Sequence, residues 1–415
     1  MNGLALSVVL ALALLNAGCG SFRSLDRDLE RLDEYCEVRV TIADAEDHES
    51  AHVVLLVDAS TKIVKALSLH FGKDELVLHV PQGNYFLGAF EDQNENLRRD
   101  ENEPVTIYGE PTQISLRSGA APVELQLVLG EPGTRLTAEV ESLIESIRSS
   151  SAKITHQSLA RVATLDDDRF APSVGQQGMW EPATFIEDGY HGLYMLQEYD
   201  PARTPIVFVH GIGGTPRDFV GMIASIDSTK FQAWVFYYPS ALRLADLGQY
   251  LLKSVDLMLA EHGVEEFFLV AHSMGGLVST EAVQRAATSP SAKGLGLFVT
   301  IASPLGGMAS AEYGVDWSPT VMPCWYDLTP GSQFLRNLYR KDIDPLAYYM
   351  AFAYERSGFG GESSDGTVPL SSQLRDEAQA RARGVIGVNS DHVGVLSDPH
   401  TLAWINGLFL QHLSD

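Results

Sequence analysis

Hydrophobic and polar positions alternate with two different periods along this chain, and the change of period divides it into two parts. In the first part, short apolar runs with partial period-two alternation are separated by turn-rich pieces at spacings of about ten residues. The runs are YCEVRVTI, HVVLLVD, ELVLHV, NYFLGAFE, VTIYG and VELQLVL. This pattern is typical of short strands, and it predicts a small N-terminal β-sandwich over residues 35–133.

In the second part, residues 191–415, apolar strands alternate with amphipathic helices. The strand-like runs are GLYMLQEY, PIVFVHG, FQAWVFYY, EEFFLVAHS and GLFVTIAS, and the clearest helical runs are LADLGQYLLKSVDLMLAEHG and MGGLVSTEAVQRAAT. Such alternation predicts an α/β domain whose mostly parallel sheet is covered by helices on both faces. Residues 134–190 are predicted to be a linker that contains a helix, because residues 134–150 carry apolar side chains at helical spacing.

The N-terminus predicts export. Leu4–Leu15 is apolar apart from Ser7 and spans about 18 Å as a helix, too short for a bilayer core of about 30 Å. Residues 1–18 are therefore interpreted as a signal peptide. Ala17-Gly18-Cys19 resembles a bacterial lipobox, which implies a lipid on Cys19, a tether over residues 19–34 and a place in the cell envelope facing the periplasm or outer membrane; ordinary secretion and a signal anchor are the alternatives.

The composition of the chain restricts the classes of partner that it can bind. The chain has 415 residues, 45% of them hydrophobic, and a formal charge of −25. Nucleic acid is excluded as a partner on this balance, because binding phosphates requires a basic face. Cys36 and Cys324 would be the remaining cysteines of a lipidated chain; export permits a disulfide between them, and two buried free thiols are the alternative.

The strongest candidate chemistry lies in Ala271-His272-Ser273-Met274-Gly275-Gly276, where a buried strand meets a helix. In a nucleophile elbow the turn is so sharp that the residues two positions either side of the serine must be small, as Ala271 and Gly275 are. The serine hydroxyl would then lie at a helix N-terminus, which favours a developing anion. Tight packing of small residues between helix and strand is the alternative explanation.

A second motif lies upstream, where the strand PIVFV runs into His210-Gly211-Ile212-Gly213-Gly214. A glycine turn at this place can aim backbone N–H groups at an oxyanion, and the Ile212 and Met274 amides are the expected pair. A dinucleotide loop is excluded because the third glycine of its motif would fall at Pro216. His210 and His272 make poor bases, because each is fixed within a turn.

Together these two motifs resemble lipases and esterases of the α/β-hydrolase fold, notably small bacterial lipases with V-H-G-I-G-G and A-H-S-M-G-G and deacylases similar to the GPI inositol-deacylase group. The resemblance covers roughly residues 192–412 and implies a triad in the order Ser, Asp, His. Of the five aspartates considered, Asp365 follows a strand within the run SDGTVP; of the three histidines, His392 follows the strand GVIGV. Ser273, Asp365 and His392 are thus the expected catalytic residues.

The resulting hypothesis is a membrane-tethered serine hydrolase that cleaves carboxylic esters, of lipids or other acyl compounds, through an acyl-enzyme without a cofactor. An acyltransferase, thioesterase or amidase with the same triad, and a non-catalytic adhesion or scaffold protein of the envelope, are the alternatives. Residues 308–345 are longer than an ordinary connection and hold several aromatic side chains, so they are expected to form a partial cap over an acyl pocket. Packing of those aromatics against the sheet is the alternative. Acyl length and oligomeric state are left open.

Two metal-like patterns lie in the first part. A structural calcium site is one hypothesis, because Asp92, Asn94, Asn96, Arg98, Asp100 and Glu103 match positions 1, 3, 5, 7, 9 and 12 of an EF-hand loop, with Leu97 where that loop prefers glycine. A solvated acidic loop is the alternative. His48-Glu49-Ser50-Ala51-His52 matches a zinc-protease motif by letters, yet it lies between strand-like runs and is interpreted as a coincidence.

Overall fold

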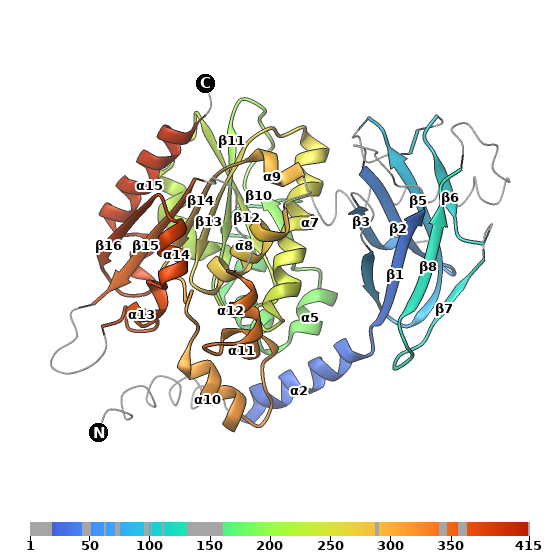
Figure 1. Ribbon diagram of the computed structural model, residues 1–415, viewed down its shortest axis with the longest axis horizontal. Helices are drawn as coiled ribbons and strands as arrows, with labels where there is room; N and C mark the ends of the chain where they lie inside the picture. Colours follow the sequence, from blue (N-terminus) through green and yellow to red (C-terminus); the bar gives the residue numbers. More distant parts are fainter. Residues whose placement is uncertain are drawn as a thin grey trace. The chain divides into compact units, whose positions relative to one another are not determined.

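The computed structural model describes eleven segments of the chain. They are residues 19–43, 51–61, 64–70, 75–94, 99–100, 102–109, 112–130, 161–286, 290–339, 347–355 and 363–413. Two compact units are present (Figure 1). The larger unit comprises Met1–Asp28, Arg161–Ser254 and Val264–Asp415, and the smaller unit comprises Leu29–Ala160 and Val255–Gly263.

The smaller unit contains two sheets. Its strands are β1 (Cys36–Ala43), β2 (Ala51–Asp58), β3 (Val64–His70), β4 (Leu76–Val80), β5 (Gly83–Asp92), β6 (Val105–Ile107), β7 (Ile114–Leu116) and β8 (Val123–Val128). One sheet has the order β4-β1-β8 and the other β3-β2-β5-β6, with β7 paired to β5. Buried side chains of both sheets, such as Val38, Val54 and Leu87, belong to one hydrophobic cluster. All six apolar runs lie on strands; β3 and β7 were not expected.

The larger unit is built on an eight-stranded sheet, which confirms the predicted mostly parallel arrangement. Its strands are β9 (Arg161–Val162), β10 (Gly192–Met195), β11 (Thr204–Val209), β12 (Phe231–Tyr237), β13 (Phe267–His272), β14 (Leu295–Ile301), β15 (Tyr348–Tyr354) and β16 (Gly384–Asn389). The order is β16-β15-β14-β13-β11-β12-β10-β9, and every neighbouring pair is parallel except β10 with β12. Every residue of β12 and β13 is buried, as expected for central strands covered on both faces.

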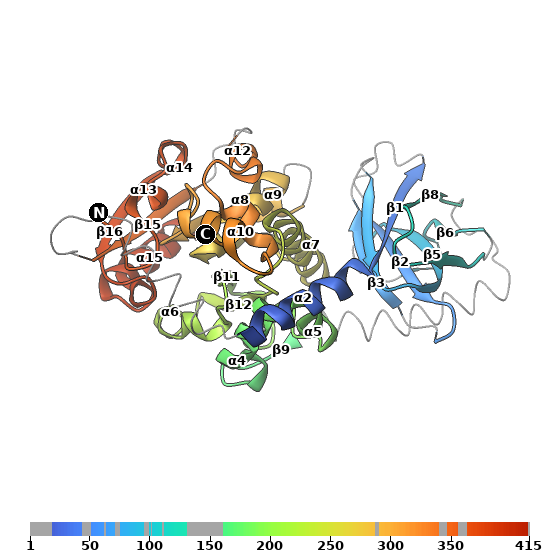
Figure 2. The same ribbon diagram turned by 90° about the horizontal axis from the view of Figure 1, so that it is seen from below.

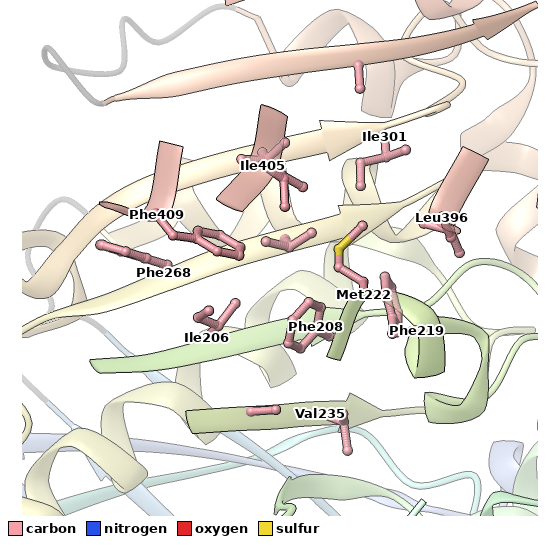
Figure 3. Packing of buried hydrophobic residues seen from close by; sticks show 14 of the residues in the cluster. Ile206, Phe208, Phe219, Met222, Val235, Phe268, Ile301, Leu396, Ile405 and Phe409 are labelled. Carbon is pink, nitrogen blue, oxygen red and sulfur yellow. The ribbon is translucent and has the colours of Figure 1, made fainter. Parts of the chain in front are cut away.

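Helices cover both faces of this sheet. They are α4 (Pro172–Trp180), α5 (Pro182–Glu187), α6 (Val220–Ser225), α7 (Leu244–His262), α8 (Met274–Arg285), α9 (Pro290–Gly294), α10 (Ala309–Trp317), α11 (Pro323–Leu328), α12 (Gln333–Asn337), α13 (Leu370–Gln373), α14 (Asp376–Arg381) and α15 (Pro399–His412). Met222 of α6 and Ile405 and Phe409 of α15 pack on one face, against Phe208 and Phe268 (Figure 3). Figure 2 shows α8 on the side of the sheet opposite to α6.

Two segments differ from the sequence-based expectation. Residues 19–34 were expected to form a tether, but Cys19–Asp33 is a helix, α2, whose Phe22 and Leu25 are buried. Residues 161–190 were placed in a linker, but they form β9, α4 and α5 within the larger unit. The helices α4 and α5 have only nine and six residues, which is too short for apolar side chains to repeat at a clear helical spacing. The predicted linker helix at 134–150 lies outside the described residues.

Cys36 and Cys324 are each a buried free thiol within their own unit. Cys324 is fully buried within the larger unit, and this burial raises the pKa of its thiol well above the ordinary value.

Candidate active site

Ser273 lies at the turn between β13 and α8, and its backbone is in a conformation that side chains rarely adopt. Its φ is 53° and its ψ is −130°, in the positive-φ region that favours glycine. The turn is crowded: a Cβ atom added to Gly275 would lie 2.5 Å from the carbonyl oxygen of Val209. The small residue expected two positions after the serine is thus required by contact with β11.

Three side chains that are far apart in the sequence form a hydrogen-bonded chain at this turn. The Ser273 Oγ and the His392 Nε2 are 2.9 Å apart, and the His392 Nδ1 and the Asp365 Oδ2 are 2.7 Å apart. Ser273 and Asp365 are buried, at 6% and 1% exposure. An imidazole held in this way by a carboxylate on Nδ1 presents Nε2 as an acceptor for the serine hydroxyl proton.

The Asp365 carboxylate is held by three donors besides His392. Its Oδ1 accepts the backbone N–H groups of Thr367 (2.9 Å) and Val368 (2.6 Å), and its Oδ2 accepts the amide Nε2 of Gln373 at 3.2 Å. Gln373 also donates to the carbonyl oxygens of Val368 and Ala353. This buried glutamine was missed in the sequence, because it follows the SDGTVP run without any motif of its own.

The side chain of His272 forms a hydrogen bond with the backbone of His392. The His272 Nε2 lies 2.8 Å from the His392 carbonyl oxygen, and the two rings are 4.7 Å apart between centroids. Burial, with a smaller contribution from the charge on His392, lowers the pKa of His272 to about 3. A neutral His272 with its proton on Nε2 donates this hydrogen bond, so it can position His392 without titrating at neutral pH.

His210 has a different role in the turn after β11. Its Nδ1 bonds the Gly211 carbonyl oxygen at 2.7 Å, and its ring stacks on Tyr238 with the centroids 4.2 Å apart. Burial lowers the pKa of His210 to about 4. None of the hydrogen bonds between described residues joins His210 to Ser273.

The glycine turn after β11 lies directly beside the serine. A Cβ atom on Gly211 would come within 2.8 Å of the Ser273 Cβ, and Gly213 adopts a φ of 62° while its N–H donates to the Ser240 Oγ at 2.9 Å. Within the part of the chain that the structure describes, neither the Ile212 nor the Met274 backbone N–H donates to a protein acceptor. Met274 is the first residue of α8, whose N-terminal partial charge favours an anion.

Helix α4 supports this turn and was not expected from the sequence. A Cβ atom on Gly175 would lie 2.7 Å from the Gly214 carbonyl oxygen, and the Gln176 Nε2 donates to the Gly213 carbonyl oxygen at 3.3 Å. Because Gly175 has no side chain, α4 can lie directly against the turn. The sequence signal was a glycine within an otherwise unassigned stretch.

The segment expected to form a cap, residues 308–345, contains α10, α11 and α12. The Cys324 N–H of α11 donates to the Ala241 carbonyl oxygen, just after β12, at 2.9 Å; at its other end the Leu328 carbonyl oxygen accepts the N–H of Met308, in the connection that follows β14, at 2.7 Å. The sheet order places β11 and β13 between β12 and β14. Helix α11 therefore crosses the carboxyl edge of the strands that lead to Gly211 and Ser273.

The cap contains a cavity of about 420 Å³, lined by Arg243, Val315, Tyr326, Asp327, Thr329, Pro330, Gly331, Ser332, Gln333 and Phe334. Ser273 and His392 do not line it, so it is not a pocket for their substrate as the side chains stand. Asp327, one of the aspartates considered for the triad, instead forms a two-pronged ion pair with Arg243 at 2.6 and 2.9 Å. That ion pair joins α11 to the loop before α7.

The residues of the calcium hypothesis are only partly described, since Asn96 and Arg98 lie outside the described residues. Asp92 and Glu103 are buried, and the two Glu103 oxygens accept the backbone N–H groups of Gln93 and Asp100 at 2.9 and 2.8 Å. Asn94 donates to Asp100 at 2.7 Å. No group of three or more His, Cys, Asp or Glu residues that could hold a metal occurs among the described residues. Calcium binding stays a prediction.

Comparisons with known proteins give likenesses of fold alone. No family model and no curated protein matches this sequence. Among solved structures, a Bacillus licheniformis lipase in its mature form is 19% identical with a TM-score of 0.42, over 54% of this chain and 98% of that chain. Aspergillus fumigatus lipase B is 17% identical with a TM-score of 0.39, over 54% and 56% of the two chains. A hydrolase from Oleispira antarctica is 13% identical with a TM-score of 0.38, over 53% and 94%.

Proposed function

We propose that this protein is a serine hydrolase that cleaves carboxylic esters, with Ser273 as nucleophile, His392 as general base and acid, and Asp365 as the group that orients His392. The observation that carries the proposal is the hydrogen-bonded chain from Ser273 Oγ through His392 to Asp365, at 2.9 and 2.7 Å. Its place at a strained turn between a central strand and a helix matches the nucleophile elbow of the α/β-hydrolase fold.

The mechanism follows from these positions. As Ser273 Oγ attacks the acyl carbon, its proton passes to His392 Nε2, and the carbonyl oxygen becomes an anion that the Ile212 and Met274 amides bind. His392 then gives the proton to the departing alcohol, which leaves an acyl ester on Ser273. Water, deprotonated by His392, attacks that ester and releases the carboxylic acid. The Asp365 carboxylate stabilises the imidazolium that forms in both halves.

The experiment is a comparison of two serine variants on α8 and its N-terminus. Ser273→Ala is expected to abolish hydrolysis of p-nitrophenyl esters and labelling by a fluorophosphonate, while Ser279→Ala, which removes the hydroxyl of another buried serine, retains both. Equal labelling of the Ser273→Ala variant contradicts the proposal. Labelling without ester hydrolysis supports one of the other enzymes: an acyltransferase if the acyl group passes to an alcohol, thiol or amine, and a thioesterase or amidase if thioesters or amides are hydrolysed. No labelling of the parent supports the non-catalytic alternative.

We further propose that the protein is held in the bacterial cell envelope through a lipid on Cys19. The support is the apolar leader and the lipobox-like Ala17-Gly18-Cys19. Among the described residues, no helix has the length and apolar character needed to cross a bilayer. Labelling of the parent by a fatty-acid analogue in a bacterial host, and loss of the label in Cys19→Ser, tests this proposal.

The smaller unit is proposed to be a β-sandwich, supported by the hydrophobic cluster that its two sheets share. A calcium ion in the loop after β5 is proposed as a structural ion of that unit. Calorimetric titration of the full chain with calcium should show heat that is reduced in Asp100→Asn; absence of heat in the parent removes the ion from the proposal.

A further inference from the structure

We infer that Tyr313, Trp317 and Tyr326, here called the aromatic surface, bind a lipid bilayer directly and face the hydrolase site toward it. The inference rests on the proposed function for what that site does, and on the structure for where the surface lies. It assigns the exposed aromatic side chains of α10 and α11, which the triad does not use, to a membrane partner.

The aromatic surface is exposed to an unusual degree. Trp317 is 73% exposed, Tyr313 is 53% and Tyr326 is 47%, and Tyr313 and Trp317 lie one helical turn apart with ring centroids separated by 6.3 Å. Trp and Tyr side chains are costly to leave in water when they are not packed, and they prefer the boundary between headgroups and acyl chains because their rings are apolar and their tips are polar. Trp325 of α11 is buried against Gly314 instead, and the guanidinium of Arg243 lies over the ring of Tyr326, 5.8 Å from its centroid. Packing therefore accounts for Trp325 and for part of Tyr326, and not for Tyr313 and Trp317.

The position of the surface connects it to the site. Helix α11 crosses the carboxyl edge of the sheet between the loops that follow β12 and β14, and the strand that leads to Ser273 ends between them. Helix α10 packs against α11. A bilayer bound at Trp317 would therefore lie on the side of the unit at which the nucleophile emerges.

Helix α2 indicates that the partner of the aromatic surface is a lipid bilayer. Asp26 accepts a hydrogen bond from the Thr320 hydroxyl at 3.4 Å, and Asp28 accepts the backbone N–H of Thr184 at 2.8 Å, so α2 is attached to the larger unit next to the segment that joins α10 to α11. Cys19, the predicted site of lipidation, is the first residue of α2 and lies about 10 Å along the helix from Asp26. A lipid on Cys19 and the side chain of Trp317 would then reach the same bilayer.

The negative charge of the protein determines which interactions can hold it on a bilayer. With a formal charge of −25, attraction to anionic headgroups is disfavoured, and Arg243, which lies over Tyr326, is paired with Asp327. Binding is therefore expected to come from burial of aromatic area, to occur on uncharged phosphatidylcholine and to change little with salt.

The test uses residues 19–415 with Cys19→Ser, so that neither the apolar leader nor an acyl chain contributes, and vesicles of phosphatidylcholine at low and high salt. Adding Tyr313→Ala and Trp317→Ala is expected to weaken binding by at least about tenfold, whereas Leu410→Ala, which removes a side chain of α15 about as exposed as Tyr313, leaves it unchanged. In the parent, vesicles are expected to shift the tryptophan emission to shorter wavelength, and Trp317→Phe is expected to remove that shift while retaining most of the binding.

Three results overturn the inference. They are no binding by the Cys19→Ser chain, equal binding by the Tyr313→Ala/Trp317→Ala variant, and a surface that joins two copies of the chain, seen as a change of mass in solution between the parent and this variant. Hydrolysis of a short water-soluble ester is measured on every variant in parallel. Its absence from all of them refutes the proposed function and leaves the vesicle result interpretable, while its retention together with any of the three results refutes only the aromatic surface.

Discussion

The backbone conformation of Ser273 predicts that this residue, the proposed nucleophile, lowers the stability of the fold. Its φ of 53° and ψ of −130° place a Cβ atom in a region that costs a residue other than glycine about 1–3 kcal/mol. Replacing Ser273 by alanine removes the hydroxyl and keeps this cost, whereas replacing it by glycine removes both. Glycine also makes the unfolded chain more flexible, which costs about 0.4–1 kcal/mol. The Ser273→Gly variant is therefore expected to be roughly 1 kcal/mol more stable than Ser273→Ala.

The measurement can be confined to the relevant unit. All five tryptophans lie in the larger unit, at Trp180, Trp234, Trp317, Trp325 and Trp404. Unfolding followed by their fluorescence should therefore report that unit, and the difference between the two variants corresponds to about 2–4 °C in Tm. Both variants lack the nucleophile, so activity does not enter the comparison. If Ser273→Gly unfolds at the same temperature as Ser273→Ala or below it, the turn is not strained and the elbow argument is wrong.

Three further predictions concern the groups around Ser273. Asp365→Asn should lower kcat by about 10⁴ with little change in stability, because the amide no longer holds the imidazole in the productive tautomer; a kcat within tenfold of the parent contradicts this role. His272→Leu should lower kcat about tenfold at constant KM, since the buried His392 carbonyl loses its donor, and His272→Gln, which retains an N–H at that place, should recover most of it; equal loss in both variants indicates a packing effect only. His272 and His210 stay neutral in the folded unit to pH values of about 3 and about 4, while the unfolded chain binds their protons near pH 6.5. Stability should therefore fall as the pH drops below 6.5, by up to about 1.4 kcal/mol per pH unit for each histidine, and with a shallower slope in His272→Gln; the same slope in that variant contradicts the assignment.

Local sequence signals predicted the sheet of the larger unit and the position of the elbow. The strands are continuous apolar runs, and Gly275 is required by a contact between neighbouring elements that any serine elbow of this kind shares. Asp365 and His392 were chosen because each follows a strand, and the parallel order then brings both to the same edge as Ser273. The local sequence pattern and the strand order were therefore sufficient to predict where Ser273, Asp365 and His392 lie.

The residues that sequence analysis missed act through contacts made only after folding. Gln373 has no motif, and its importance depends on reaching back to Asp365 and to β15. Helix α2 was interpreted as a charged tether although its apolar side chains, Phe22, Leu25, Leu29 and Leu32, recur at helical spacing. That Phe22 and Leu25 are buried is evident only from partners such as Trp180 of α4. Such side chains are recognised from their partners, which a single sequence does not identify.

The hydrogen bonds around Ser273 suggest why a strained turn can persist. The Ser273 N–H donates to the Ile301 carbonyl oxygen of β14 at 2.9 Å, the His392 N–H donates to the Asp365 carbonyl oxygen at 2.9 Å, and His272 donates to the His392 carbonyl oxygen. Each member of the triad is thus fixed by backbone bonds to another segment, and relaxing the serine would break a bond to the sheet. Donors and acceptors held in this way need little reorganisation when charge develops, which is the property that lowers a barrier. The same bonds that sustain the strain at Ser273 therefore hold the imidazole in place for proton transfer, so weakening them should reduce kcat before it unfolds the unit.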